Sequence, residues 1–150
     1  ILNYKDKSQY MQKTKIAIVF GVSGQDGAYL SHFLLKKGYK VIGTTRNKSA
    51  KNLYRLKKLK IKNKIKLYKG EATNKKFCEK ILSSKINEIY YLAGDSSVIN
   101  SFETPDVSLE SNINGLLNIL QIIKKKNIKR NYLMQAQVNF METIKKINII

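Results

Sequence analysis

Three glycines stand three residues apart directly after a run of apolar residues. They are Gly21, Gly24 and Gly27, and the apolar run covers 16–20. In such a spacing the first glycine permits a tight turn, the second lets a pyrophosphate approach the backbone, and the third lets a helix pack closely. The N-terminus of that helix offers unpaired N–H groups and a partial positive charge to phosphates. The pattern predicts a dinucleotide phosphate site, with an ordinary strand-to-helix turn as the alternative.

Alternating strands and helices are expected to position this turn. The apolar pattern predicts strands over 16–20, 40–44, 65–69, 88–92 and 128–134. Helices are expected over 28–37, within 49–60, after Asn74, and from Pro105 to about Lys126. This order indicates the α/β class: a Rossmann-like, doubly wound parallel sheet of about five strands with right-handed crossovers.

The apolar spacing within each helix predicts which residues face the core. The first helix is expected to bury Tyr29, Leu30, Phe33, Leu34 and Leu35. The short second helix would carry Leu53, Leu56 and Leu59 at three-residue spacing, and the third would carry Phe77, Cys78, Ile81 and Leu82. The long helix after Pro105 is expected to bury Leu109, Ile113, Leu116, Leu117, Leu120 and Ile123.

The chain is strongly basic, with a formal net charge of +19 at pH 7. Nearly all of that charge comes from Lys, and Lys, Asn and Ile are residues of A/T-rich codons. The lysines are spread along the chain, whereas nucleic-acid sites more often combine Arg with exposed aromatic residues. The composition therefore argues against nucleic acid as the main partner. The charge would still steer phosphate-bearing ligands toward the chain.

Cysteine and histidine are scarce. Cys78 is the one cysteine, which excludes an internal disulfide and fits a cytoplasmic location. His32 is the one histidine, which excludes a His-rich metal site and a Ser-His-Asp triad. No apolar run reaches the length of a membrane span, so no membrane partner is expected.

The end of the second predicted strand indicates which cofactor is bound. An NAD site places a carboxylate there for the ribose 2′-OH, but this chain reads Gly43-Thr-Thr-Arg46. Arg46 can pair with a 2′-phosphate, and Lys48 can assist. We therefore expect NADP rather than NAD, the alternative being that Arg46 is a solvated loop charge.

Several motifs of the chain are more specific than the glycine spacing alone. They are Gly24-Gln-Asp-Gly27, Thr44-Thr-Arg46, Tyr90-Tyr-Leu-Ala-Gly94, Ser96-Ser-Val98, Ser101-Phe-Glu103 with Pro105, and Ser111-Asn-Ile-Asn-Gly115. Together they resemble GDP-mannose 4,6-dehydratases, of the extended short-chain dehydrogenase/reductase superfamily. The resemblance runs from about Lys15 to Ala136.

That resemblance implies an NADP-dependent lyase that is redox-neutral overall. C4 of the mannose ring of GDP-mannose is oxidised, a proton leaves C5, water leaves from C6, and the hydride returns to C6. The product is GDP-4-keto-6-deoxymannose, and full-length members are expected to form homo-oligomers. Two alternatives stay open: another sugar-nucleotide epimerase or dehydratase of this superfamily, and a non-catalytic dinucleotide-binding module.

The resemblance also implies which residues bind the cofactor. They are Gly21, Ser23, Gly24, Gln25, Asp26, Gly27, Arg46, Glu71, Ala72, Leu92, Ala93, Gly94 and Ser96. Glu71 stands where the family has Asp, and it would accept a hydrogen bond from the adenine amine after repositioning. Asp95 stands where the family has a neutral residue, and it would add negative charge near the nicotinamide.

After Ala136 the sequence departs from the family. Where the family has its catalytic hydroxyl and carboxylate, this chain reads Gln137-Val-Asn-Phe-Met141, and no Tyr-x-x-x-Lys follows. No catalytic residue is therefore assigned, and we expect the chain alone to be inactive on GDP-mannose. We expect a flexible polar tail over 1–14, a partial NADP-binding domain over 15–136, and a divergent tail over 137–150 such as a frameshifted or truncated gene would encode.

Overall fold

The computed structural model describes residues 14–93, 105–128 and 132–135, and in them five parallel strands form one sheet. The strands are β1 (Ile16–Phe20), β2 (Lys40–Thr45), β3 (Ile65–Lys69), β4 (Glu88–Tyr91) and β5 (Tyr132–Gln135). Their order across the sheet is β3-β2-β1-β4-β5. The predicted parallel sheet is confirmed, and only residues 129–131 of the fifth predicted strand lie outside the described residues.

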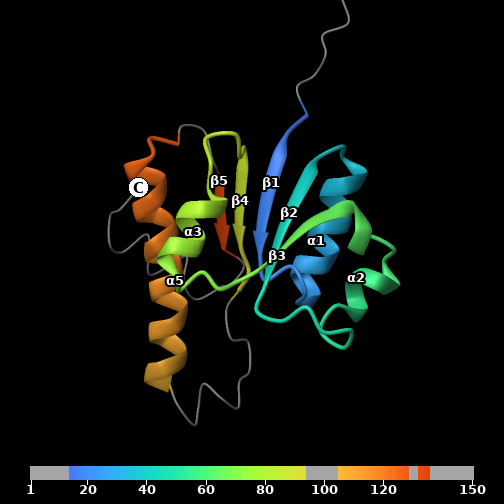
Figure 1. Ribbon diagram of the computed structural model, residues 1–150, viewed down its shortest axis with the longest axis horizontal. Coiled ribbons are helices and arrows are strands. Elements are labelled where there is room, and N and C mark those ends of the chain that lie inside the picture. The colour runs from blue at the N-terminus through green and yellow to red at the C-terminus, as the bar shows by residue number, and fades with distance from the viewer. Residues whose placement is uncertain (1–13, 94–104, 129–131, 136–150) are drawn as a thin grey trace, which may run out of the picture.

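Helices cover both faces of the sheet. They are α1 (Gln25–Lys36), α2 (Tyr54–Lys58), α3 (Lys75–Ile81) and α5 (Pro105–Lys125), with a 3₁₀ turn η1 (Lys62–Lys64) between α2 and β3. Figure 1 shows α1 and α2 on one side of the sheet and α3 and α5 on the other. This is the doubly wound arrangement expected from the sequence.

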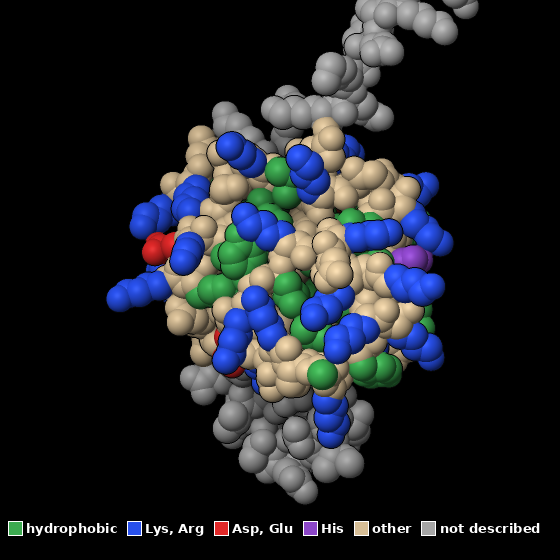
Figure 2. All heavy atoms as spheres, turned by 45° about the vertical axis from the view of Figure 1, so that its right-hand side comes forward, with side chains coloured by type: hydrophobic (Ala, Val, Ile, Leu, Met, Phe, Trp, Pro, Cys, Tyr) green, Lys and Arg blue, Asp and Glu red, His purple; other side chains and the backbone are tan. Residues whose placement is uncertain are grey.

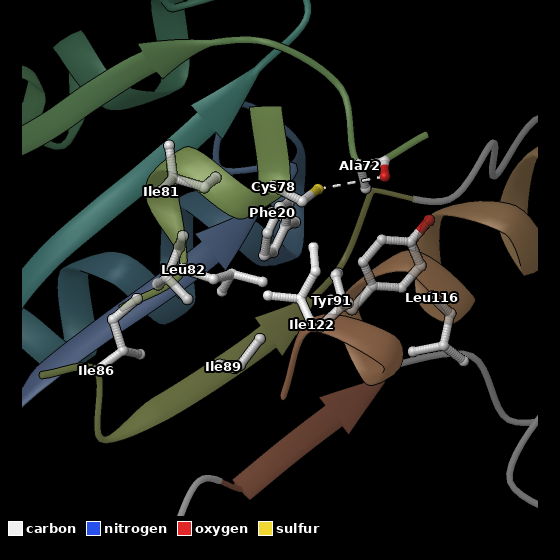
Figure 3. Close-up of a cluster of buried hydrophobic side chains, with 12 residues drawn as sticks. Phe20, Ala72, Cys78, Ile81, Leu82, Ile86, Ile89, Tyr91, Leu116 and Ile122 are labelled. Carbon is white, nitrogen blue, oxygen red and sulfur yellow. Dashed lines mark hydrogen bonds between the residues drawn. The ribbon is translucent and has the colours of Figure 1, made fainter. Parts of the chain in front are cut away.

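Alternate residues of β1 supply the two cores that these helices cover. Ala17 and Val19 are buried against α1 and α2, while Ile18 and Phe20 are buried on the other face. Figure 3 shows the second core, where side chains from β1, β4, α3 and α5 meet. A strand buried on both faces explains why 16–20 is apolar throughout rather than alternating.

The inward face of α1 differs from the prediction. Tyr29 is 60% exposed and Phe33 is 55% exposed, so both predictions were wrong. The buried face instead carries Gly27, Ala28, Ser31 and Leu34, and Leu30 and Leu35 are half-buried. Because Gly27 is pressed against the turn after β1, the small residues beside it face the sheet, and that rotation turns the two rings to solvent.

The long helix α5 shows a smaller difference of the same kind. Leu116 is buried as predicted, but Leu117 is 44% exposed, and that prediction was wrong. Ile119 and Ile122, which the spacing argument missed, are buried in its place. These positions lie three residues apart and follow Leu116 along one face of the helix. The side chain of Leu109 lies outside the described residues.

Asn74 caps α3 as predicted, since its Oδ1 accepts a hydrogen bond from the N–H of Phe77 at 3.0 Å. Replacing Asn74 with Ala should lower the free energy of unfolding by about 1 kcal/mol, because that N–H loses its acceptor. Urea denaturation measures the loss. Asn74→Ser keeps an acceptor and should lose less than half as much; equal losses would contradict the capping role.

Candidate dinucleotide-binding site

The glycine turn lies at the point in the sheet where the strand order reverses, between β1 and β4. β1 pairs with β2 on one side and with β4 on the other. The helix α1, which follows β1, covers one face of the sheet, and α5, the next described helix after β4, covers the other. In doubly wound folds the crevice beyond the carboxyl ends of such strands holds the ligand. Gly21 follows β1 and Leu92 follows β4, so both segments border this crevice.

Gly21 is fixed by close contacts with its surroundings. Its φ is +81°, and a Cβ there would lie 2.6 Å from the carbonyl oxygen of Leu92. The N–H groups of Gly21 and Val22 both donate to the carbonyl of Thr44 at 3.1 Å. The turn is therefore bonded to the end of β2 and in contact with the end of β4, as the tight-turn prediction requires.

The first turn of α1 offers free donors to an anion. Gly24 caps the helix without a side-chain hydrogen bond, and the first backbone bond runs from Ala28 to Gly24 at 3.0 Å. Within the described part of the chain, the N–H groups of Gln25, Asp26 and Gly27 have no acceptor. Such a helix start fits a phosphate group.

A polar cluster joins this turn to the loop after β2; we define it as Ser23, Thr45, Asn47 and Asn52. The hydroxyls of Ser23 and Thr45 lie 3.0 Å apart. The Asn52 side-chain amide donates to Ser23 Oγ at 3.2 Å and to Thr45 Oγ1 at 2.8 Å, and it also donates to the carbonyl of Asn47. The cluster holds the β2 loop against the glycine turn.

The two cations predicted to contact a 2′-phosphate lie in that loop. Arg46 directly follows β2, and its side chain is exposed. The ammonium of Lys48 donates to the carbonyl of Leu67 on β3 at 2.9 Å, which uses one of its three donors. The contacts of Arg46 and Lys48 with a phosphate stay predictions.

The loop after β3 carries the residues predicted to contact adenine. Glu71 is exposed and accepts a hydrogen bond from the Thr73 hydroxyl at 3.3 Å, whereas Ala72 is buried. Asn118 of α5 donates to the carbonyls of Ala72 and Thr73 at 3.1 and 2.9 Å. Asn118 thus holds this loop in place, a role that the sequence pattern did not reveal.

Beyond β4 the structure describes only part of the predicted site. The N–H of Leu92 donates to the carbonyl of Phe20 at 3.0 Å, which extends the pairing of β1 and β4, and Ala93 is exposed. Gly94, Asp95 and Ser96 lie outside the described residues. The roles of all these residues toward a cofactor stay predictions.

Two buried groups that could react are held in their protonated forms. Burial raises the pKa of the Cys78 thiol to about 11 and that of the Tyr91 hydroxyl to about 12. Figure 3 shows the Cys78 thiol directed to the carbonyl of Ala72, at 3.3 Å. At neutral pH neither group is available as a nucleophile or a base.

Among the residues with described positions, no cluster of three His, Cys, Asp or Glu side chains is arranged to hold a metal ion. None of the described helices is long and apolar enough to cross a membrane.

The face formed by α1, α2 and β3 is strongly cationic. Figure 2 shows Lys and Arg side chains spread over the molecule there, with few acidic ones. A hollow of about 380 Å³ on this side is lined by Lys57, Lys60, Lys62 and Asn63. None of these residues belongs to the glycine turn. The hollow is therefore separate from the candidate site, although its charge adds to the field that attracts anions.

Comparison with known proteins identifies the family. Residues 18–140 match the family model described as GDP-mannose 4,6 dehydratase. Over 128 residues the chain is 37% identical to GDP-mannose 4,6 dehydratase 1 of Arabidopsis thaliana, which covers 81% of this chain and 36% of that protein. The GDP-mannose 4,6 dehydratase of Homo sapiens is 35% identical over 116 residues, which is 73% of this chain and 31% of the human protein. The chain thus spans about a third of the length of these relatives.

Solved structures share the fold. The UDP-glucose 4-epimerase of Bifidobacterium longum, in complex with NAD+ and UDP, matches with a TM-score of 0.67 and 26% identity. The match covers 79% of this chain and 36% of that one. The UDP-glucose 4-epimerase of Thermotoga maritima, with UDP-glucose, gives a TM-score of 0.65 and 23% identity over 79% of this chain and 37% of that one. The family-model match covers most of the chain, and together with the identities to the curated relatives it shows that the chain belongs to the GDP-mannose 4,6-dehydratase family.

Proposed function

We propose that this chain binds NADP at the glycine turn and forms the cofactor-binding part of a GDP-mannose 4,6-dehydratase. One observation carries the proposal: in the described part of the chain, the backbone N–H groups in the first turn of α1 have no acceptor. This turn follows Gly21, at the point where the strand order of the sheet reverses. Membership of the family supplies the reaction, in which GDP-mannose becomes GDP-4-keto-6-deoxymannose.

The preference for NADP over NAD rests on the charges beside β2. No acidic side chain occurs from Arg46 to Gly70, so no carboxylate follows β2 to accept from a ribose 2′-OH. Arg46 stands exposed at that point. The Bifidobacterium epimerase is bound to NAD+, which supports a nicotinamide dinucleotide in this fold, while the choice of NADP rests on Arg46.

Each segment has a separate task in the proposed site. The N–H groups of Gln25, Asp26 and Gly27 hold the pyrophosphate, and Arg46 holds the 2′-phosphate. Glu71 and Ala72 contact the adenine, in a loop fixed by Asn118. Leu92 and Ala93 are assigned to the nicotinamide side, and the roles predicted for Gly94 and Ser96 lie outside the described residues. When bound, the nicotinamide supplies the reversible hydride transfer that the dehydration needs.

Substitution of Arg46 tests the cofactor assignment. Arg46→Ala should weaken NADP binding by about ten- to a hundredfold, the loss of one charge-assisted phosphate contact. NAD binding should change by less than about twofold, because NAD lacks the 2′-phosphate. Isothermal titration calorimetry measures both affinities.

Lys51→Ala is the matched control for Arg46→Ala, since Lys51 is an exposed cation in the same loop. It should leave the ratio of NADP to NAD affinity unchanged. Equal losses for both cofactors in Arg46→Ala, or an equal change of the ratio in Lys51→Ala, would contradict a 2′-phosphate contact at Arg46.

The reaction is tested with a chimera. Residues 15–135 of this chain would replace the matching segment of the Arabidopsis relative, which supplies the rest of the enzyme. We expect NADP binding and formation of the 4-keto sugar nucleotide from GDP-mannose. A chimera that binds NADP and yields no 4-keto product would count against the proposed reaction while leaving the cofactor assignment intact.

A further inference from the structure

Arg55 lies beside the polar cluster but forms no part of it. It belongs to α2, its side chain is half-buried, and its Nη1 donates to the carbonyl of Ser23 at 3.5 Å. Its guanidinium carbon lies 4.9 Å from the centroid of the Tyr54 ring. The ring and the Ser23 carbonyl together hold the guanidinium next to the glycine turn.

Arg55 has unused donors, and no described residue serves as its counter-ion. A guanidinium has five N–H donors, and the bond to Ser23 uses one of them. The ion pairs found among residues 14–93 and 105–128 are Lys15–Glu88 and Lys125–Glu79, and neither includes Arg55. A partly buried cation without an anion is costly, and a guanidinium fork matches a phosphate.

The position of Ser23 indicates which anion would reach Arg55. Ser23 is the third residue of the glycine turn, and its hydroxyl lies 3.0 Å from that of Thr45 at the end of β2. In dinucleotide-binding folds the adenosine ribose lies between these two segments. Arg46 directly follows β2, whereas Arg55 belongs to α2.

We propose that Arg55 supplies a second guanidinium for the 2′-phosphate of NADP and so strengthens the preference for NADP over NAD. This inference rests on the proposed cofactor site. Arg55 belongs to another segment than Arg46: Arg46 directly follows β2, whereas Arg55 is the second residue of α2. The polar cluster is uncharged and fixes the distance between the two loops, while the two arginines supply the charge.

A structural role for Arg55 predicts a different result. If Arg55 only held the Ser23 carbonyl, its loss would distort the glycine turn and weaken every adenine nucleotide alike. If it contacts the 2′-phosphate, only nucleotides that carry this group should bind less well. Two small nucleotides make the distinction: 2′,5′-ADP carries the 2′-phosphate and 5′-AMP does not, and both contact only the adenosine side of the site.

The experiment is calorimetric titration of the full 150-residue chain with 2′,5′-ADP and with 5′-AMP. The chain should bind 2′,5′-ADP more tightly than 5′-AMP. Arg55→Gln, which removes the charge and keeps a polar side chain, should lower the affinity for 2′,5′-ADP by about tenfold and that for 5′-AMP by less than about twofold. Arg55→Lys should lower the affinity for 2′,5′-ADP less than Arg55→Gln does, since lysine keeps the positive charge. Lys58→Gln, an exposed cation on the same helix, is the control and should change neither affinity.

The outcomes separate this inference from the proposed function. Equal losses for both nucleotides in Arg55→Gln would overturn the inference in favour of a structural role. An unchanged affinity for 2′,5′-ADP in Arg55→Gln, with a loss in Arg46→Gln, would overturn the inference and leave the NADP assignment standing. Equal affinity of the unsubstituted chain for the two nucleotides would overturn both.

Discussion

Replacement of Gly21 by alanine is expected to abolish dinucleotide binding and to destabilise the fold. Gly21 has a φ of +81°, and a left-handed conformation costs a residue with a Cβ about 1–2 kcal/mol. The new Cβ would also lie 2.6 Å from the carbonyl oxygen of Leu92 and 2.9 Å from the Cα of Ala93. Both are backbone atoms, so no side chain can rotate away. Overpacking of this kind typically costs a further 1–3 kcal/mol or so.

Gly38 is a matched control for Gly21 in the same molecule. Its φ is +82°, yet a Cβ there would meet nothing within 4 Å. Gly38→Ala should therefore show the conformational cost alone, about 1–2 kcal/mol, and leave NADP binding unchanged. Urea denaturation and calorimetric titration of both variants measure the difference. Equal destabilisation by the two substitutions would mean that the close approach of the β1 and β4 ends adds nothing to the cost of Gly21→Ala.

The sequence was sufficient to predict the sheet, because its strands carry strong local signals. Residues 16–20 form β1 over the range expected, and the glycine turn follows at the carboxyl end of that strand. The start of α1 differs by three residues, 25 instead of 28, since the helix begins directly after Gly24. Buried parallel strands and the glycines between strand and helix are local features, and local features can be read from one sequence.

The helix faces were harder to predict, because apolar spacing gives the period of a helix but leaves its rotation uncertain. For α1 the rotation is set by the contact of Gly27 with Val22, where a Cβ would lie 2.9 Å from the Val22 Cα. That contact places Ala28 and Ser31 inward and leaves Tyr29 and Phe33 exposed. Tertiary packing decided the orientation, and the aromatic residues gave a misleading signal.

The sequence predicted the backbone elements of the site but not the side chains that support them. Asn52 contacts Ser23 across 29 positions of sequence, Arg55 contacts it across 32, and Asn118 contacts Ala72 across 46. No spacing rule connects residues so far apart. One usable signal was present: Asn52 and Arg55 are three residues apart beside the buried Leu53 and Leu56, so they share one side of the segment.

Replacement of Gly115 by alanine should destabilise the protein, although alanine in place of glycine inside a helix ordinarily stabilises it by about 1 kcal/mol. A Cβ at Gly115 would overlap the hydroxyl oxygen of Tyr91 and lie 3.1 Å from the Cβ of Ala72. Tyr91 is buried and packs on Phe20 with ring centroids 6.1 Å apart, so its ring cannot move aside. We expect the free energy of unfolding to fall by about 1–3 kcal/mol.

A double-mutant cycle with Tyr91→Phe identifies the cause. Tyr91→Phe removes the oxygen that the new Cβ would overlap, so Gly115→Ala should be less destabilising in that background, with a favourable coupling of about 1–2 kcal/mol. The rescue should be partial, because the Cζ of the ring would still lie 3.1 Å from the Cβ. Urea denaturation of the four proteins gives the coupling. Additive effects would mean that the glycine is needed for another reason than the approach of α5 to β4. A coupling of the expected sign would show that Gly115 lets α5 pack closely against Tyr91 of β4, next to Ala72 in the loop that carries Glu71.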